Sequence, residues 1–140
     1  MKAVALVLAV APLFAQPPAD TQQGGVKWEH TLKAAQARAK AEKKLILMDL
    51  WAEWCGPCQY LKKKVFPTAE CQAALAKVVP FDALVQTRDM KDLPEGRALA
   101  EKYKLEAYPT LLMVDETGKE LRRHVGYMDA AGLAKFVEGK

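Results

Sequence analysis

The sequence has few of the residues from which disulfide-stapled scaffolds, metal sites or nucleic-acid surfaces are built. Its 140 residues include only 3 cysteines and 2 histidines. Three cysteines are too few to staple a small scaffold, and the odd number leaves at least one thiol unpaired or reactive. The longest basic run is Lys62–Lys64, and the net charge of +4 is scattered. A nucleic-acid-binding stripe is therefore excluded.

The length and composition instead predict one folded domain. A chain of 140 residues is sufficient for one domain of ordinary size and too short for two. Its share of hydrophobic residues is 51% and of charged residues 27%, which excludes a disordered or low-complexity chain. No internal repeat is visible along the sequence.

The N-terminal residues predict a secretory signal peptide over residues 1–15. Lys2 supplies one positive charge, Ala3–Ala11 is an unbroken apolar run, and Ala15 provides a small residue at the cleavage point. The alternative, an uncleaved membrane anchor, is disfavoured because a spanning helix needs about 20 apolar residues. Residues 16–27 contain two prolines and two glycines and predict a flexible linker. A folded domain over residues 28–140 then works outside the cytoplasm.

Strand and helix patterns alternate along this domain. We expect helices over about 31–43, 56–65, 68–77, 94–103 and from 129 onwards, and strands over about 45–51, 81–85, 110–114 and 120–125. The segment 45–51 is apolar on both faces except at Asp49, which is typical of a central strand covered on both sides. Because proline is uncommon inside a strand, Pro80 leaves the first residue of the strand at 81–85 undefined. The pattern predicts an α/β fold, with helices on both faces of a sheet of four to five strands.

The reactive chemistry lies in the sequence Trp-Cys-Gly-Pro-Cys, which ends at Cys58. With Cys55 at the start of a helix and Cys58 one turn later, the two sulfurs are close enough to bridge. The free backbone N–H groups and the helix dipole favour a thiolate at Cys55, which predicts that Cys55 is the nucleophile. Cys58 is then the resolving thiol. Pro57 suits the first helical turn, and Gly56 lets a partner's backbone approach closely.

Two other interpretations use the same cysteines. Cys-x-x-Cys is also half of a zinc site, which Cys71 with His30 or His124 could complete. Pro57 and the position between a strand and a helix favour redox chemistry instead, so we expect no metal. A cysteine protease is disfavoured because a neighbouring cysteine would oxidise its nucleophile outside the cell. We expect Cys71 to be a buried apolar residue and both histidines to be surface or hydrogen-bonded residues.

The segment Asp49–Cys58 closely resembles the active-site stretch of thioredoxin, in the same strand-to-helix context. Tyr108–Thr110 resembles the cis-proline loop of that family. Gly126–Asp129, and the pattern from Val65 to Leu75, are more similar to the C-terminal periplasmic domain of the DsbD electron-transfer proteins and their secreted relatives. The resemblance covers roughly residues 28–138. It implies a thioredoxin fold with a central mixed sheet.

The resemblance also implies roles for individual residues. Asp49 matches a buried carboxylate that relays a proton to or from the resolving cysteine. Desolvation in a central strand should raise its pKa, unless it is a structural residue that faces solvent at the strand end. Pro109 matches the cis-proline that packs against the disulfide and exposes the backbone of Tyr108 to a substrate strand. Trp54 is expected to shield the nucleophile and line the docking surface together with Gly56 and Pro57.

These residues predict a thiol–disulfide oxidoreductase that works in the periplasm or elsewhere outside the cytoplasm. A reductase of protein disulfides is favoured, and a disulfide oxidase or isomerase is the alternative. A second alternative, from a different functional class, is a non-catalytic thiol protein such as a metal carrier or a binding module. The Cys55–Cys58 disulfide would be the redox group, with no cofactor. We expect the protein to be a monomer. Its expected partners are disulfide-containing proteins and a membrane electron donor of the DsbD or CcdA type, with no nucleic acid.

Overall fold

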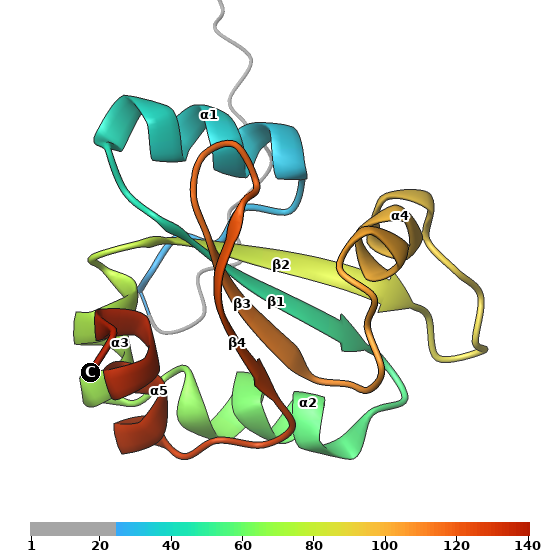
Figure 1. The fold of residues 1–140 in the computed structure, drawn as a ribbon. Helices are drawn as coiled ribbons and strands as arrows, with labels where there is room; N and C mark the ends of the chain where they lie inside the picture. The colour runs from blue at the N-terminus through green and yellow to red at the C-terminus, as the bar shows by residue number, and fades with distance from the viewer. Residues whose placement is uncertain (1–24) are drawn as a thin grey trace, which may run out of the picture.

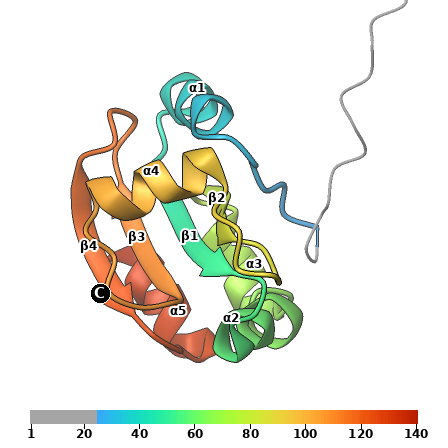
Figure 2. The ribbon, with the colours of Figure 1, turned by 90° about the vertical axis from the view of Figure 1, so that its right-hand side faces the viewer.

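A four-stranded mixed sheet runs through the centre of the protein, of which the computed structural model describes residues 25–140. The strands are β1 (Ile46–Ala52), β2 (Val79–Gln86), β3 (Thr110–Val114) and β4 (Glu120–Val125). They lie in the order β2-β1-β3-β4, as Figure 2 shows. Strand β1 runs parallel to β2 and antiparallel to β3, and β3 and β4 pair as an antiparallel hairpin. The prediction of a mixed sheet is confirmed, with four strands.

Helices cover both faces of this sheet (Figure 1). On one face lie α1 (Leu32–Glu42) and α4 (Pro94–Lys102), and on the other lie α2 (Gly56–Tyr60), the π-helical turn η1 (Leu61–Val65), α3 (Ala69–Leu75) and α5 (Ala130–Glu138). Two of the predicted helices begin at N-cap residues, because Thr31 Oγ1 accepts from Ala34 N and Asp129 Oδ1 accepts from Gly132 N. Within residues 25–140, no helix has the length and apolar character needed to cross a bilayer.

The predicted signal peptide, residues 1–15, lies outside the described residues, as does the predicted linker up to residue 24. From Val26 onwards, this N-terminal segment makes hydrogen bonds to the helices of the folded domain. Val26 N donates to Gln72 Oε1 at 3.0 Å, and the carbonyl of Lys27 accepts from Arg38 at 2.9 Å. The last residues of the predicted linker are therefore attached to α1 and α3.

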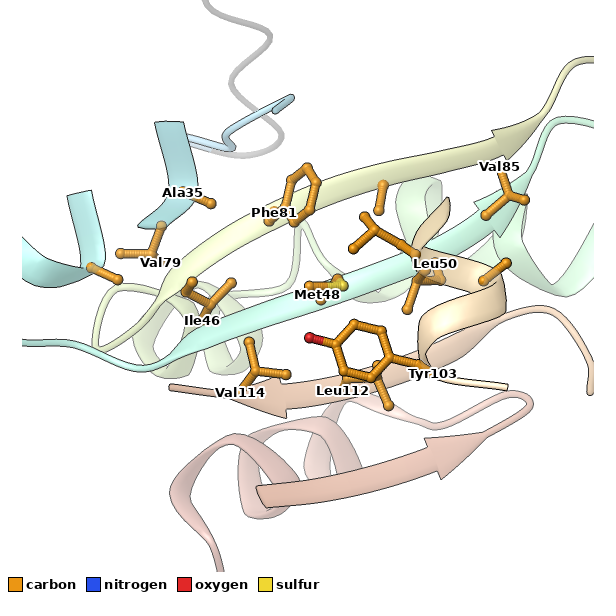
Figure 3. Packing of buried hydrophobic residues seen from close by; sticks show 14 residues of the cluster. Ala35, Ile46, Met48, Leu50, Val79, Phe81, Val85, Tyr103, Leu112 and Val114 are labelled. Atoms are coloured by element: carbon orange, nitrogen blue, oxygen red, sulfur yellow. The ribbon is translucent and has the colours of Figure 1, made fainter. Parts of the chain in front are cut away.

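Strand β1 divides the core into two clusters, because its alternate side chains point to opposite faces. Ile46, Met48 and Leu50 pack with Phe81 and the buried alanines of α1, as Figure 3 shows for the cluster under α1 and α4. Leu47 packs in the second cluster, between the sheet and the helices α3 and α5. Burial on both faces explains the nearly continuous apolar run of this strand.

Pro80 lies inside β2 without breaking the sheet, since β2 is an edge strand. Val79 N donates inward to the carbonyl of Leu45, whereas Asp82 N donates outward to the carbonyl of Glu29, each at 2.9 Å. Because the direction alternates along a strand, the backbone nitrogen of Pro80 faces outward, where its missing N–H costs no bond to β1. The strand therefore begins two residues earlier than the sequence predicts.

Replacing Gly96 with alanine should destabilise the fold by about 3 kcal/mol, since overpacking forces the backbone to move. Helix α4 packs so closely on β2 that a Cβ atom at Gly96 would overlap the carbonyl of Leu84 and lie 2.7 Å from Val85 Cα. Thermal or urea unfolding measures the change. Gly56→Ala is the matched control, because a Cβ atom there meets nothing within 4 Å. Equal stability of the two variants would contradict this close packing.

Candidate active site

The two cysteines of Cys-Gly-Pro-Cys form a disulfide where β1 passes into α2. Cys55 is the N-cap of α2, and its Sγ accepts a hydrogen bond from Cys58 N at 3.2 Å. The Cα atoms of the two cysteines are 5.3 Å apart. Both residues are buried, with 4% exposure at Cys55 and 1% at Cys58, so Cys55 is the slightly more exposed residue. The helix start that the sequence predicts near Gly56 is confirmed.

The antiparallel pairing of β1 and β3 places the loop before β3 beside the disulfide. The Tyr108–Pro109 peptide bond in this loop is cis, the conformation that the resemblance implies. Tyr108 packs against the small cluster formed by Ala52 and the two cysteines. The carbonyl of Pro109 accepts from Gly126 N at 2.8 Å, which ties the loop to the end of β4.

Two edge-to-face aromatic pairs lie on the segments that flank the disulfide in sequence or pack against it. Trp54 is 46% exposed and meets Tyr108 edge to face, with ring centroids 5.8 Å apart. Its indole N–H donates to Gln86 Oε1 at 3.0 Å, an anchoring contact that sequence reasoning missed. On α2, Gly56 and Pro57 are exposed, and two further exposed rings, Tyr60 and Tyr127, form a second edge-to-face pair at 5.7 Å. Of the predicted docking residues, Trp54, Gly56 and Pro57 are exposed beside the cysteines in sequence, Tyr108 packs against the cysteine cluster, and Pro109, which follows Tyr108, is buried.

Asp49 lies in the middle of β1 and is 1% exposed, so the solvent-facing alternative is wrong. Burial raises its pKa to about 6 from an ordinary value of 3.8, in the predicted direction. The ammonium of Lys62, with Nζ 3.4 Å from Asp49 Oδ2, opposes this rise in pKa, and the nearby Asp82 carboxylate adds to it. A carboxyl group with this pKa can exchange protons near neutral pH.

Lys62 is a further functional candidate. The sequence pattern shows it only as one of three consecutive lysines, Lys62–Lys64. Its side chain is only 9% exposed, and Nζ lies 3.1 Å from Asp82 Oδ2 and 4.0 Å from the ring centroid of Trp51. Trp51 Nε1 in turn donates a hydrogen bond to Asp82 Oδ1. Lys63 and Lys64 are exposed. One signal could have singled out Lys62: it follows Cys58 by four residues, which places both on one face of a helix.

The other residues of the zinc interpretation lie apart from the disulfide. Cys71 is fully buried in the core cluster of α3 and α5, where desolvation raises its pKa and Sγ lies 3.7 Å from the carbonyl of Ala130. His30 is exposed, with Nδ1 3.8 Å from Asp82 Oδ2, and His124 contacts the carbonyl of Tyr127. Among residues 25–140, no three histidine, cysteine or acidic side chains are grouped so that they could hold a metal ion.

Residues 32–139 match the family model of the thioredoxin-like domain. The chain belongs to the thioredoxin-like family. Among curated proteins, this thioredoxin-like chain is 31% identical over 145 residues to the thiol:disulfide interchange protein DsbD of Klebsiella pneumoniae. The match covers 94% of this chain but 24% of that relative, so the chain spans about a quarter of the relative's length.

Solved structures show the same fold. A putative disulphide-isomerase of Bacteroides thetaiotaomicron is 32% identical, with a TM-score of 0.68, and the match covers 84% of this chain and 94% of that one. The reduced C-terminal domain of DsbD from Neisseria meningitidis is 26% identical, with a TM-score of 0.64, and the match covers 77% of this chain and 92% of that one. The thioredoxin fold is therefore confirmed, and the family supports a thiol–disulfide redox role for the Cys55–Cys58 pair.

Proposed function

We propose that this thioredoxin-like protein reduces the disulfides of other proteins outside the cytoplasm, through the Cys55–Cys58 pair. The observation that carries the proposal is the position of Cys55 as the N-cap of α2, where its sulfur accepts the N–H of Cys58. Backbone N–H groups and the helix dipole stabilise a thiolate at that position. The redox group is the cysteine pair itself, so the reaction needs no cofactor.

The reduced protein would act in two steps. The Cys55 thiolate attacks one sulfur of the substrate disulfide, the substrate S–S bond breaks, and the other substrate sulfur leaves as a thiolate that takes up a proton. Cys58 then loses its proton to the Asp49 carboxylate and attacks Cys55 Sγ. The mixed disulfide breaks, and the second substrate sulfur leaves as a thiolate that takes up a proton from water. Two electrons pass from the dithiol to the substrate, and the Cys55–Cys58 disulfide remains.

The exposed residues around the sulfurs would bind the substrate. Trp54 and Tyr108 offer apolar faces on one side of the disulfide, and a substrate strand would run beside the backbone of Tyr108 and Pro109. Exposed Gly56 leaves room for the substrate backbone to come close to Cys55. Recognition would then depend on an accessible disulfide in an extended segment rather than on one substrate sequence.

Repeated turnover needs electrons from another protein. An oxidising compartment outside the cytoplasm does not supply them, so we propose a membrane donor of the DsbD or CcdA type that reduces the Cys55–Cys58 disulfide. The similarity to a thiol:disulfide interchange protein supports exchange with such a partner. A signal peptide over residues 1–15 would direct the protein to that compartment.

Insulin reduction and redox equilibration with glutathione test the proposal together. We expect dithiothreitol-coupled reduction of insulin and a redox potential below about −220 mV, the reducing side of the superfamily range. A potential above about −150 mV would instead assign the protein as an oxidase. Absence of thiol turnover under both conditions would favour the non-catalytic metal carrier or binding module.

A further inference from the structure

Asp49 needs a route by which its proton reaches solvent. It lies in a central strand and is 1% exposed. A docked substrate would cover the face of the molecule that carries the disulfide. An ordinary thiol is a weaker acid than a carboxylic acid, so a proton that reaches Asp49 from Cys58 tends to return. The attack of Cys58 therefore goes forward more readily if the proton can move on while the substrate is still bound.

Asp82 provides the neighbouring position on the edge strand. It is the register partner of Asp49 in the parallel β1–β2 pair, so the two carboxylates point to the same face of the sheet. Lys62 Nζ lies between them, 3.4 Å from Asp49 Oδ2 and 3.1 Å from Asp82 Oδ2. The rings of Trp51 and Trp28 enclose the ammonium, with centroids at 4.0 Å and 5.6 Å. The three charged groups form a chain of two ion pairs that share Lys62, although Lys62 Nζ and the Asp49 oxygens make no hydrogen bond in this geometry.

The outer end of this chain opens into a cavity. Asp82 lines a cavity of about 360 Å³ together with Trp51, His30 and the N-terminal turn of α4 at Glu95. His30 Nδ1 lies 3.8 Å from Asp82 Oδ2, and the His30 side chain is 49% exposed. The carboxylate of Glu95 accepts from Leu32 N. The disulfide and the cis-proline loop do not line this cavity.

We propose that Lys62 and Asp82 form a proton path from Asp49 to this cavity, which stays open when a substrate protein covers the disulfide. The proposal rests on the proposed function, since it concerns the second step of that reaction. The Lys62 ammonium passes one proton to the Asp82 carboxylate and takes one from the protonated Asp49. Asp49 is then a carboxylate again, Lys62 is still an ammonium, and Asp82 releases its proton to water or His30 in the cavity. No electron moves in this step.

The hydrogen bond from Trp51 Nε1 holds Asp82 in place for this transfer. The Trp51 ring also lies under the ammonium of Lys62, so one side chain orients both members of the path. Trp51 is thus a positioning residue rather than a group that exchanges protons.

The test compares Asp82→Asn with the parent protein in single-turnover stopped-flow experiments. The resolving step should slow about tenfold with insulin, which is less than the roughly 100-fold or more typical of a group that exchanges the proton with the reacting atom itself, because Asp82 acts one step further along the path. It should slow less with a small disulfide such as oxidised glutathione, which leaves the active-site face open to water. The pH midpoint of the step should also fall, because the Lys62 charge then acts on Asp49 alone. Asp89→Asn, which removes an exposed carboxylate of the loop after β2, is the matched control and should change neither rate.

A second variant separates a proton path from a purely electrostatic effect. Lys62→Arg keeps the positive charge, but a guanidinium does not release a proton, so a path through position 62 should slow while the charge remains. Parental rates for both variants with insulin would overturn the path. The path would also be overturned if the resolving step were slow in Asp82→Asn but had the parental rate in Lys62→Arg. Equal slowing of Asp82→Asn with insulin and with oxidised glutathione would overturn it as well. If the parent itself fails to reduce insulin, the proposed function fails instead.

Discussion

Replacing Cys55 with serine abolishes the reduction of insulin, whereas replacing Cys58 with alanine stops the reaction after one attack. We expect this difference because Cys55 caps α2 and receives the N–H of Cys58, while Cys58 lies deeper. The Cys58→Ala variant keeps a nucleophile but lacks a resolving thiol, so it accumulates a mixed disulfide with the substrate. Insulin turbidity measures turnover, and mass spectrometry of the trapped adduct identifies the linked cysteine.

Cys71→Ala is the control for these variants. Cys71 is buried in the cluster of α3 and α5, away from the cluster that holds the disulfide, so its removal should leave both steps intact. Alkylation of the reduced protein with limiting reagent gives an independent readout. Labelling of Cys58 or Cys71 before Cys55 would contradict the assignment of the nucleophile.

Asp49→Asn should slow the resolving step near pH 7 by about 100-fold, because the amide cannot accept the Cys58 proton. The parent rate should rise with pH through about 6, where Asp49 ionises, and the variant should lose this inflection. Stopped-flow measurement of mixed-disulfide decay from pH 5 to 8 gives both quantities. The same rates for parent and variant across this range would remove Asp49 from the reaction.

The same substitution should change stability in a direction that depends on pH. The pKa of Asp49 is raised from 3.8 to about 6 by folding, so the folded protein binds more protons than the unfolded chain between these values. The stability contributed by the protonated carboxyl is present below about pH 4 and is lost as pH rises through about 6. Burying the ionised carboxylate then costs about 3 kcal/mol above pH 7. Relative to the parent, Asp49→Asn should therefore gain stability from pH 4 to pH 8, which urea unfolding can measure. If the difference in unfolding free energy between variant and parent did not change with pH, the pKa of Asp49 would not be raised by folding.

The elements that position the disulfide could be predicted because their signals are local. Strand β1 is a short apolar run, Thr31 and Asp129 are residue types that favour helix caps, and the segments 110–114 and 120–125 are two separate strand patterns. The start of α2 followed from the Cys-Gly-Pro-Cys sequence itself. Each of these features is contained within about ten neighbouring residues, the range over which residue patterns are informative.

The charged chain behind the disulfide could not be predicted in the same way. Asp49 and Asp82 are 33 residues apart in sequence and meet only through the register of β1 and β2. Lys62 turns inward where the helix widens into the π-helical turn η1, whose end is marked by a bond from Phe66 N to the carbonyl of Leu61 at 2.9 Å. The four-residue spacing places Lys62 on the helical face of Cys58, but it does not reveal that two carboxylates of neighbouring strands meet the Lys62 ammonium there.

Both halves of the active site are attached to central strands, and this arrangement affects how activity is lost when the protein unfolds on heating. The disulfide follows directly from β1 and the cis-proline loop leads directly into β3, and these two strands pair along the middle of the sheet. Segments held in this way open only when the whole sheet opens, unlike frayed ends or surface loops, which open alone. We therefore expect thiol exchange to be lost together with the native sheet in one cooperative event when the protein is heated.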